Sequence, residues 1–409
     1  MAQFGFRSRS ETAENEHLVL SLQPFRFATR PRKAAKVLAE RNRTTFISPA
    51  RIGRAGQWDE AKDYFEGESL RVLQVRAAQP ATTPSRASQL RNAMSVYAPA
   101  FVRWAAAVAR TPARTVFATS LPVLPLALLH RALHRSQLII DINERPGAPT
   151  VKGSVTSLIH RVEPALVRLA TRYATAVSVA TEGDVDTLRT RFHYDTAKLL
   201  RNVPMAGWRA PYVEPDSSPT LKIVTVGSIF EGRAFEMMIG AAHRAHSRGV
   251  DLQLEIYGAG RSDYVASLEQ LIAELDASDY VSLKGRVDAD EVSETYLRGQ
   301  IGLALYEGTT LANDGLSNKI LECVSTGRPV LAGDLPENRR FVESNKVGWL
   351  TEVDEESIAV AFEEISRDPR RTELARHCRL LGDTELTWEK EFENAFGERL
   401  GLPHDQVTV

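Results

Sequence analysis

Short apolar runs alternate with amphipathic stretches along most of the chain. Runs of four to seven residues bounded by polar or turn residues are typical of buried strands, and apolar spacings of three and four residues are typical of helices. The expected strands include 17–22, 45–47, 70–75, 115–118, 137–141, 174–180, 222–226, 252–257, 281–284, 301–306, 329–332 and 348–350. Strands that alternate with helices predict right-handed βαβ units and therefore parallel sheets.

One proline-rich polar segment interrupts this alternation. Residues 206–219 lie between two halves that each carry their own set of strands, and we interpret this segment as a linker. A chain of 409 residues is also long enough for two domains. We therefore predict an α/β protein with an N-terminal Rossmann-like domain over 1–205 and a C-terminal one over 220–380, facing a central cleft. Residues 381–409 form a terminal segment with an amphipathic helix.

Composition narrows the class of protein. Hydrophobic residues make up 43% and charged residues 25% of the chain, which is typical of globular proteins. Two cysteines, Cys323 and Cys378, are too few for a disulfide framework, so we expect a reducing cytoplasm. The first residues lack the apolar core of a signal peptide, and proline, His130 and Arg131 interrupt the most apolar stretch, 121–133. We expect a soluble protein.

Charge is divided unevenly between the halves. Residues 1–205 carry 30 Lys and Arg against 16 Asp and Glu, whereas 206–409 carry 21 against 36. Between Ser69 and Ile140 there are nine arginines and no acidic residue. This asymmetry favours contact with an anionic lipid surface, and a solvated basic face is the alternative. Nucleic acid is disfavoured, because aromatic residues are not interleaved with the arginines.

The most informative segment runs from Asp314 to Pro329. Ser317 is placed as an N-cap for a helix over 318–326, and Gly327 as its C-terminal glycine. The start of such a helix, with its free backbone N–H groups, can hold a diphosphate. The carboxylates of Asp314 and Glu322 could accept hydrogen bonds from the hydroxyls of a sugar and a ribose. An ordinary capped surface helix with a solvated Glu322 is the alternative.

This segment resembles the nucleotide-sugar signature of retaining glycosyltransferase family 4, which has the GT-B fold. The resemblance rests on SNKILECVSTGRPVLAGDLPENRRFVE, and IVTVGSIFEGRAFEMMIGAAHRA, LEIYGAGR, VSLKGRVDADEV and IGLALYE extend it in the same order. It implies transfer of a sugar from a nucleotide-diphosphate sugar, with retention of configuration, to an acceptor hydroxyl on a glycan, a lipid-linked compound or a small molecule. It also implies that the C-terminal helix crosses back to the N-terminal domain.

The resemblance also assigns residues to the donor site. It implies that Glu322 binds the ribose, Asp314 the sugar ring, and Arg233 with Lys319 the diphosphate. An arginine often follows Gly227 in the family, but Ser228 stands there in this chain. The remaining residues expected to line the donor site are Gly258, Gly260, Gly315, Leu316, Ser317 and Asn318.

The match in the N-terminal half is weaker. The run LIIDINERPGAP resembles a family segment in which a His-Glu pair follows a strand. Asn143 occupies the place of that histidine and Glu144 follows, so both are candidate catalytic residues together with Asp314. An asparagine can donate a hydrogen bond, but it cannot act as a general base. Local hydrogen bonds in a strand-end turn are the alternative role for Asp141 and Glu144.

The sequence offers no pattern typical of a metal site. Histidines and cysteines lack ligand spacing. The triplets at 184–186 and 288–290 fall in the first turn of expected helices, where acidic residues are favoured anyway. We therefore expect metal-independent transfer, with the helix dipole and basic side chains stabilising the leaving diphosphate.

Other classes of protein are less consistent with these patterns. A glycine-rich G-x-G-x-x-G loop is missing after the first strand, which argues against an NAD-dependent enzyme. The acidic and histidine pattern of nucleotide-sugar 2-epimerases is not visible. The strongest alternative is a non-catalytic GT-B subunit that binds a nucleotide or a protein partner. For either function we expect a polysaccharide-related role in the cytoplasm, at the inner face of the cell membrane.

Overall fold

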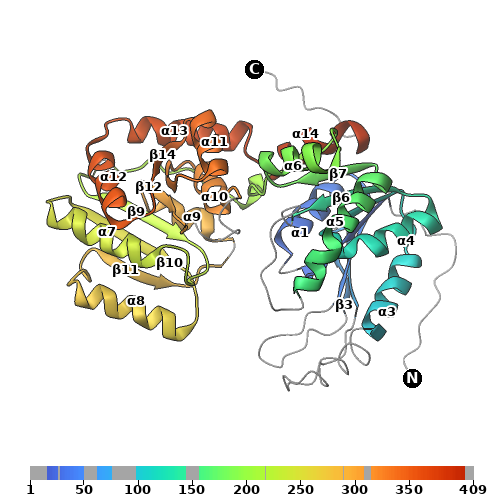
Figure 1. Cartoon of the computed structure of the whole chain (residues 1–409). Helices are drawn as coiled ribbons and strands as arrows, with labels where there is room; N and C mark the ends of the chain where they lie inside the picture. The colour runs from blue at the N-terminus through green and yellow to red at the C-terminus, as the bar shows by residue number, and fades with distance from the viewer. Residues whose placement is uncertain are drawn as a thin grey trace. The chain divides into compact units, whose positions relative to one another are not determined.

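Two parallel β-sheets, each with its own helices, organise the chain (Figure 1). The computed structural model describes residues 16–25, 28–49, 62–75, 98–143, 156–216, 218–288, 290–307 and 315–400. Unit 1 comprises Met1–Ala180 and Asp184–Leu199, and unit 2 comprises Thr181–Gly183 and Leu200–Val409. The prediction of an α/β protein with two parallel-sheet domains is confirmed. The roles predicted for the two domains, and the crossing of the C-terminal helix, stay predictions.

Unit 1 contains an eight-stranded sheet with the order β3-β4-β2-β1-β5-β6-β7-β8. All neighbouring strands are parallel except β3, which forms an antiparallel hairpin with β4. The sequence pattern missed β3 because its residues are largely exposed and polar. The strands are β1 (His17–Leu20), β2 (Thr44–Pro49), β3 (Lys62–Glu66), β4 (Leu70–Val75), β5 (Thr115–Thr119), β6 (Gln137–Ile142), β7 (Ala176–Val179) and β8 (Lys198–Leu199).

Helices cover the sheet of unit 1, and its core lies between them and the strands. Apolar residues of β1, β5, β6 and β7 are almost fully buried, which explains why these strands read as continuous apolar runs. The helices are α1 (Thr29–Ala39), α3 (Ala98–Ala109), the 3₁₀ turn η3 (Leu121–Val123), α4 (Leu124–His134), α5 (Thr156–Tyr173) and α6 (Glu182–Phe192). The helix expected over 87–109 is described only from Ala98 onward; residues 76–97 lie outside the described part.

A buried ion pair joins α1 to β6. The Arg30 guanidinium donates to both carboxylate oxygens of Asp141, from Nε at 2.5 Å and from Nη2 at 2.8 Å. Ser178 on β7 donates a third hydrogen bond to the same carboxylate at 2.7 Å, and Asp141 is fully buried. A charge in such a place requires partners of this kind, so Asp141 has a structural role in unit 1.

Unit 2 contains a six-stranded, fully parallel sheet with the order β11-β10-β9-β12-β13-β14. Its strands are β9 (Leu221–Val226), β10 (Leu252–Tyr257), β11 (Val281–Gly285), β12 (Ile301–Ala304), β13 (Val330–Gly333) and β14 (Gly348–Thr351). Its helices are the 3₁₀ turn η4 (Ala206–Trp208), α7 (Phe235–Ser247), α8 (Ser262–Glu274), α9 (Val292–Leu297), α10 (Asn318–Thr326), α11 (Pro336–Asn345), α12 (Glu355–Arg367), α13 (Arg371–Thr384) and α14 (Trp388–Leu400).

One helix of unit 2 begins later than its sequence suggests. The acidic triplet 288–290 was expected in a first helical turn, but α9 begins at Val292 with Glu291 at its N-cap. The Glu291 side chain still accepts a hydrogen bond from the backbone N–H of Asp288, at 3.3 Å. A turn therefore precedes the helix.

Arg328 ties the interdomain segment to unit 2. Its guanidinium is 1% exposed and donates to the backbone carbonyls of Val213, Leu297, Gly299 and Gly327, at 2.6–3.0 Å. The segment predicted as a linker therefore packs on unit 2 at Val213. No helix in the described ranges is long and apolar enough to cross a membrane.

The buried ion pair of unit 1 generates a stability prediction. We expect Asp141→Asn to lower the free energy of unfolding by about 3–5 kcal/mol, because the substitution leaves the buried Arg30 cation without its counter-charge. The matched control is Asp63→Asn, which breaks the exposed Arg71–Asp63 pair of the β3–β4 hairpin and is expected to cost below about 1 kcal/mol. Denaturant unfolding followed by circular dichroism measures both. Equal losses in the two variants would contradict the structural role of Asp141.

Candidate functional site

The sheet of unit 2 changes direction between β9 and β12. Strands β10 and β11 are added on one side of β9. The chain then returns to the other side of β9, where β12, β13 and β14 are added in turn. The carboxyl ends of β9 and β12 therefore flank the topological switch point, which is where open α/β sheets bind ligands. Gly227 follows β9 at this point, and Tyr306 and the start of α10 follow β12.

Helix α10 begins and ends as predicted. The Ser317 side chain accepts a hydrogen bond from the backbone N–H of Lys319 at 3.2 Å, and Gly327 adopts φ 94° at the C-terminal end. The Ser317 hydroxyl also lies 2.8 Å from the Tyr306 hydroxyl, and the Ser317 backbone N–H donates to Asn338 at 3.4 Å. Because both strand β12 and helix α11 contribute to this cap, the start of α10 is held firmly at the switch point.

The other residues predicted around the start of α10 line its approach. Gly315 and Leu316 are half-buried and Asn318 is exposed. A Cβ atom added at Gly315 would meet no heavy atom within 4 Å, so this part of the loop borders open space. The N–H groups of Lys319 and Ile320 already donate to Ser317, so an anion in this space would meet the N–H of Asn318 and the positive end of the helix dipole.

Two cationic side chains converge on Gly227. Lys319 is 3% exposed, and its Nζ donates to the Thr225 hydroxyl at 3.1 Å. A Cβ atom added at Gly227 would lie 3.1 Å from Lys319 Cε and 3.7 Å from Arg233 Nη1. Gly227 also has φ 147°, which side chains rarely adopt. Glycine is thus required where the two cations meet.

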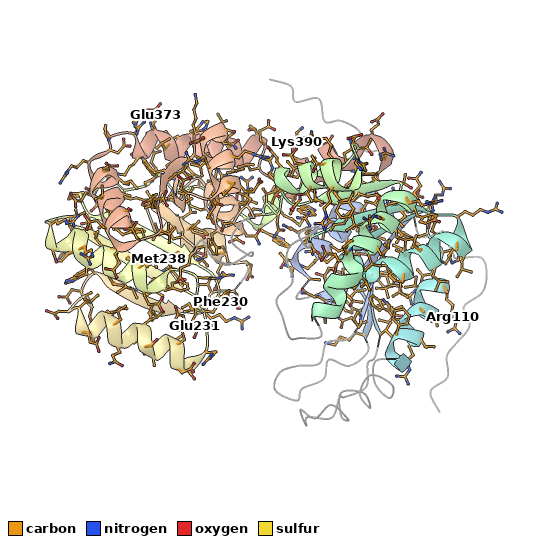
Figure 2. The ribbon with its side chains drawn as sticks, viewed as in Figure 1. Arg110, Phe230, Glu231, Met238, Glu373 and Lys390 are labelled. Atoms are coloured by element: carbon orange, nitrogen blue, oxygen red, sulfur yellow. The ribbon has the colours of Figure 1, made fainter. Side chains whose placement is uncertain are left out.

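Aromatic rings hold Arg233. Its guanidinium lies 4.0 Å from the centroid of the Phe230 ring and 5.4 Å from that of Tyr306. Figure 2 marks Phe230 in the loop after β9. No carboxylate in the described parts of the chain lies within ion-pair distance of Arg233. Stacking orients a guanidinium without neutralising it, so the positive charge remains available to a ligand.

The environment of Lys319 disfavours its charged form. The pKa of Lys319 is lowered to about 7, chiefly by burial and also by the positive charge of Arg233, while the negative charge of Glu322 opposes both. Burial likewise raises the pKa of the neighbouring Tyr306 hydroxyl. A dianionic ligand at Gly227 would supply the negative charge that this cluster lacks.

Glu322 lies one turn after Lys319 on α10 and is half-buried. Its charge acts on Lys319 and on Tyr306, so it belongs to the same electrostatic environment. Ser228, in the position that the resemblance expects to hold arginine, is exposed beside Gly227. No local pattern in the sequence marks Thr225, Phe230 or Tyr306. Their contacts with Lys319, Arg233 and Ser317 depend on which strands are neighbours.

Gly258 and Gly260 allow two loops to approach closely. A Cβ atom at Gly258 would lie 1.9 Å from the Gly227 carbonyl oxygen, and one at Gly260 would lie 2.1 Å from that of Ile229. The Ile229 N–H donates to the Ala259 carbonyl at 2.9 Å between the same loops. These two glycines therefore support the loop that carries Gly227.

The predicted residues of the N-terminal half are described only in part. Asn143 is exposed directly after β6, at the carboxyl end of a parallel strand. Glu144 and Asp314 lie outside the described residues, so their roles stay predictions. Among the residues that the structure describes, no group of three or more His, Cys, Asp or Glu could hold a metal ion.

Comparison with protein families gives a match to part of the C-terminal unit. Residues 220–368 match the family model for Glycosyl transferases group 1. The GtfA subunit of the UDP-N-acetylglucosamine–peptide N-acetylglucosaminyltransferase of Streptococcus gordonii is 26% identical over 220 residues, which cover 51% of this chain and 42% of that protein. The Streptococcus pneumoniae GtfA subunit is 24% identical over 165 residues, 40% of this chain and 29% of that protein. The chain thus spans less than half the length of these curated relatives.

Solved structures resemble nearly the whole chain. The Anabaena protein Alr3699/HepE, in complex with UDP and glucose, superposes with a TM-score of 0.67 at 15% identity, covering 95% of this chain and 100% of that chain. Sucrose-phosphate synthase from Thermosynechococcus elongatus gives 0.66 at 16% identity, covering 95% and 99%. Pneumococcal GtfA gives 0.52 at 14% identity, covering 73% and 59%. These neighbours share the GT-B fold.

The buried lysine generates a pH prediction. An unfolded lysine has a pKa of 10.5, and that of folded Lys319 is about 7. Between these values the unfolded state binds more protons, so this residue makes stability rise as the pH rises from 7 toward 10. We expect Lys319→Met to be more stable than the wild type at pH 7 and to lose this part of the slope, up to about 1.4 kcal/mol per pH unit.

Guanidinium unfolding at several pH values between 7 and 9.5 measures this slope. Lys390→Met on α14 is the matched control, since Lys390 is only half-buried. Identical slopes for the wild type and Lys319→Met would show that Lys319 keeps an ordinary pKa.

The close approach at Gly258 generates a second prediction. Gly258→Ala is expected to lower stability by about 1–3 kcal/mol, because the added methyl group meets the Gly227 carbonyl oxygen and displaces the loop. Gly207→Ala is the control, since a Cβ there meets nothing within 4 Å. Thermal unfolding of both variants tests the expectation. A Gly258→Ala protein as stable as Gly207→Ala would mean that the loop moves freely.

Proposed function

We propose that this chain, which has the GT-B fold and whose residues 220–368 match the Glycosyl transferases group 1 model, transfers a sugar from a nucleotide-diphosphate sugar to an acceptor hydroxyl. The observation that carries the proposal is the cationic cluster at the switch point of unit 2. Lys319 is desolvated there, and Arg233 is held by an aromatic ring. An anion beside the start of α10 would therefore interact favourably with both side chains. A diphosphate has the charge and size for this place.

The proposed donor is a UDP-sugar. The S. gordonii relative is named for transfer from UDP-N-acetylglucosamine, and the Anabaena neighbour was solved with UDP. In this arrangement the diphosphate lies against Gly227, Lys319 and the first turn of α10. Glu322 accepts hydrogen bonds from the ribose hydroxyls, as the family resemblance implies, and Asp314 accepts them from the sugar.

The proposed chemistry is stabilisation of a leaving group. As the bond between the anomeric carbon and the diphosphate oxygen breaks, negative charge grows on that oxygen while the acceptor oxygen bonds to the carbon, and the proton of the acceptor hydroxyl passes to the departing diphosphate. Lys319, Arg233 and the start of α10 are proposed to stabilise this charge, and their fixed positions make the stabilisation effective. We propose that these groups suffice without a metal ion, and that configuration is retained as the resemblance implies.

The acceptor is proposed to bind to unit 1, with Asn143 and Glu144 as the contacting residues. The names of the relatives point to a peptide acceptor, and the resemblance itself admits a glycan, a lipid-linked compound or a small molecule. Location in the cytoplasm and a role in polysaccharide synthesis stay predictions.

A non-catalytic role is the second candidate, favoured by Asn143. An amide in the place of the family histidine cannot accept a proton as a base. A subunit of this kind would bind the nucleotide without turnover. Incubation with UDP-N-acetylglucosamine separates the two functions. A transferase slowly hydrolyses the donor, with water as the acceptor, and releases UDP, whereas a binding subunit releases none.

The donor site generates a binding prediction. Calorimetric titration with UDP, GDP, ADP and dTDP is expected to show binding of UDP. Glu322→Ala is expected to weaken it by about 10- to 100-fold, since hydrogen bonds to a charged group contribute about 1.5–3 kcal/mol. Glu269→Ala is the control, because Glu269 is exposed on α8.

Each result has a defined meaning. Unchanged affinity in Glu322→Ala would remove the ribose role from that residue. Tight binding of another nucleotide would replace UDP as the nucleotide of the proposed donor. Failure of all four nucleotides to bind the wild type would overturn the donor site and with it the proposed transfer.

A further inference from the structure

Three helices of unit 1 lie side by side over its sheet (Figure 1). Helix α4 contacts both α3 and α5, and α3 packs on β2 and β4 while α4 packs on β5 and β6. We refer to the outward-facing residues of these helices, together with Arg110 and Arg135 at their ends, as the α3–α5 face.

Helix α3 is apolar on its outer side as well as on its inner side. Its 12 residues, APAFVRWAAAVA, include a single charged residue, Arg103. Trp104 and Val108 face the core, whereas Phe101 is 47% and Val102 65% exposed. A helix that is hydrophobic around most of its circumference normally has partners on both sides.

The neighbouring helices continue this apolar surface. Leu129 and Leu133, one turn apart on α4, are 37% and 55% exposed. On α5, Val162 and Tyr173 are 45% and 44% exposed. Single exposed apolar residues are ordinary, but six large ones on three adjoining helices indicate a surface that contacts something apolar.

The charged residues of the α3–α5 face are of one sign. Its exposed cations are Arg103, Arg110, Arg135, Arg168 and Arg172. The only acidic residue within the three helices is Glu163, which is 5% exposed. No described carboxylate lies within ion-pair distance of Arg103, Arg135 or Arg110, which Figure 2 labels.

We propose that the α3–α5 face docks unit 1 onto an anionic lipid bilayer. Lipid headgroups supply phosphates for the guanidinium groups, and the acyl region receives the side chains of Phe101, Val102, Leu129 and Leu133. A nucleic acid would satisfy the arginines, but it would leave the aliphatic side chains in water. The inference does not rest on sugar transfer, so its test is carried out without a donor.

The test is flotation of the full chain with liposomes. We expect binding to phosphatidylcholine liposomes that contain phosphatidylglycerol, weak binding to phosphatidylcholine alone, and release at high salt. Arg103→Gln/Arg110→Gln is expected to lower the partition coefficient roughly 30-fold, at about fivefold per arginine. Arg286→Gln/Arg367→Gln removes the same charge from exposed positions of unit 2 and is expected to retain most of the binding.

The apolar contribution has its own matched pair. Val102→Ser/Leu133→Ser is expected to lower binding about tenfold or more, because two side chains no longer enter the bilayer. Val360→Ser/Leu380→Ser alters exposed residues of α12 and α13 and is expected to bind as the wild type does. Unchanged unfolding midpoints show that each variant is folded.

Several outcomes would overturn the proposal. These are no binding to either kind of liposome, equal binding to both kinds, and equal losses in the variants and their controls. Binding of duplex DNA that is lost in Arg103→Gln/Arg110→Gln, without any liposome binding, would assign the face to nucleic acid instead.

Discussion

The buried guanidinium of Arg328 holds the framework on which the proposed donor site of unit 2 depends. It directly follows Gly327 at the end of α10, and its four carbonyl acceptors come from that helix end, from α9 and the turn before β12, and from the segment near Val213. Lysine could not replace it, because one ammonium group cannot reach acceptors in so many directions. With its C-terminal end anchored in this way, α10 can begin only where Ser317 meets Tyr306 at the switch point.

The cationic cluster at the start of α10 lowers the stability of unit 2. Lys319 is buried beside Arg233, so the two positive charges repel each other. An apolar side chain in place of Lys319 would remove this repulsion. Phe230 and Tyr306 hold the arginine by their ring faces, whereas a carboxylate in their place would neutralise it. In the proposed function this cluster is a preorganised site for a diphosphate.

Unit 1 contains a paired charge in its interior and, in its described part, unpaired positive charges on one surface. Inside, Arg30 and Asp141 form a bidentate ion pair, and Ser178 donates a third hydrogen bond to the carboxylate. Outside, the α3–α5 face carries arginines without carboxylates between large apolar side chains. The first arrangement stabilises the sheet, and the second favours association with an anionic partner. Five exposed arginines of the N-terminal half thus lie on a defined surface.

The sequence by itself determined the features that depend on near neighbours. Strands and helices alternate as their periodicity predicts, and α10 has the predicted bounds because a serine cap and a C-terminal glycine act within one helical turn. The family resemblance also pointed to Arg233 and Lys319, which lie together at Gly227, and their roles stay predictions like those of Glu322, Asp314 and Glu144. Only the tertiary structure decided that Arg30 meets Asp141 across 111 positions, that Gly258 touches the Gly227 loop, and that aromatic rings hold Arg233. Such contacts follow from strand order and burial, which bring distant residues together and which no local pattern encodes.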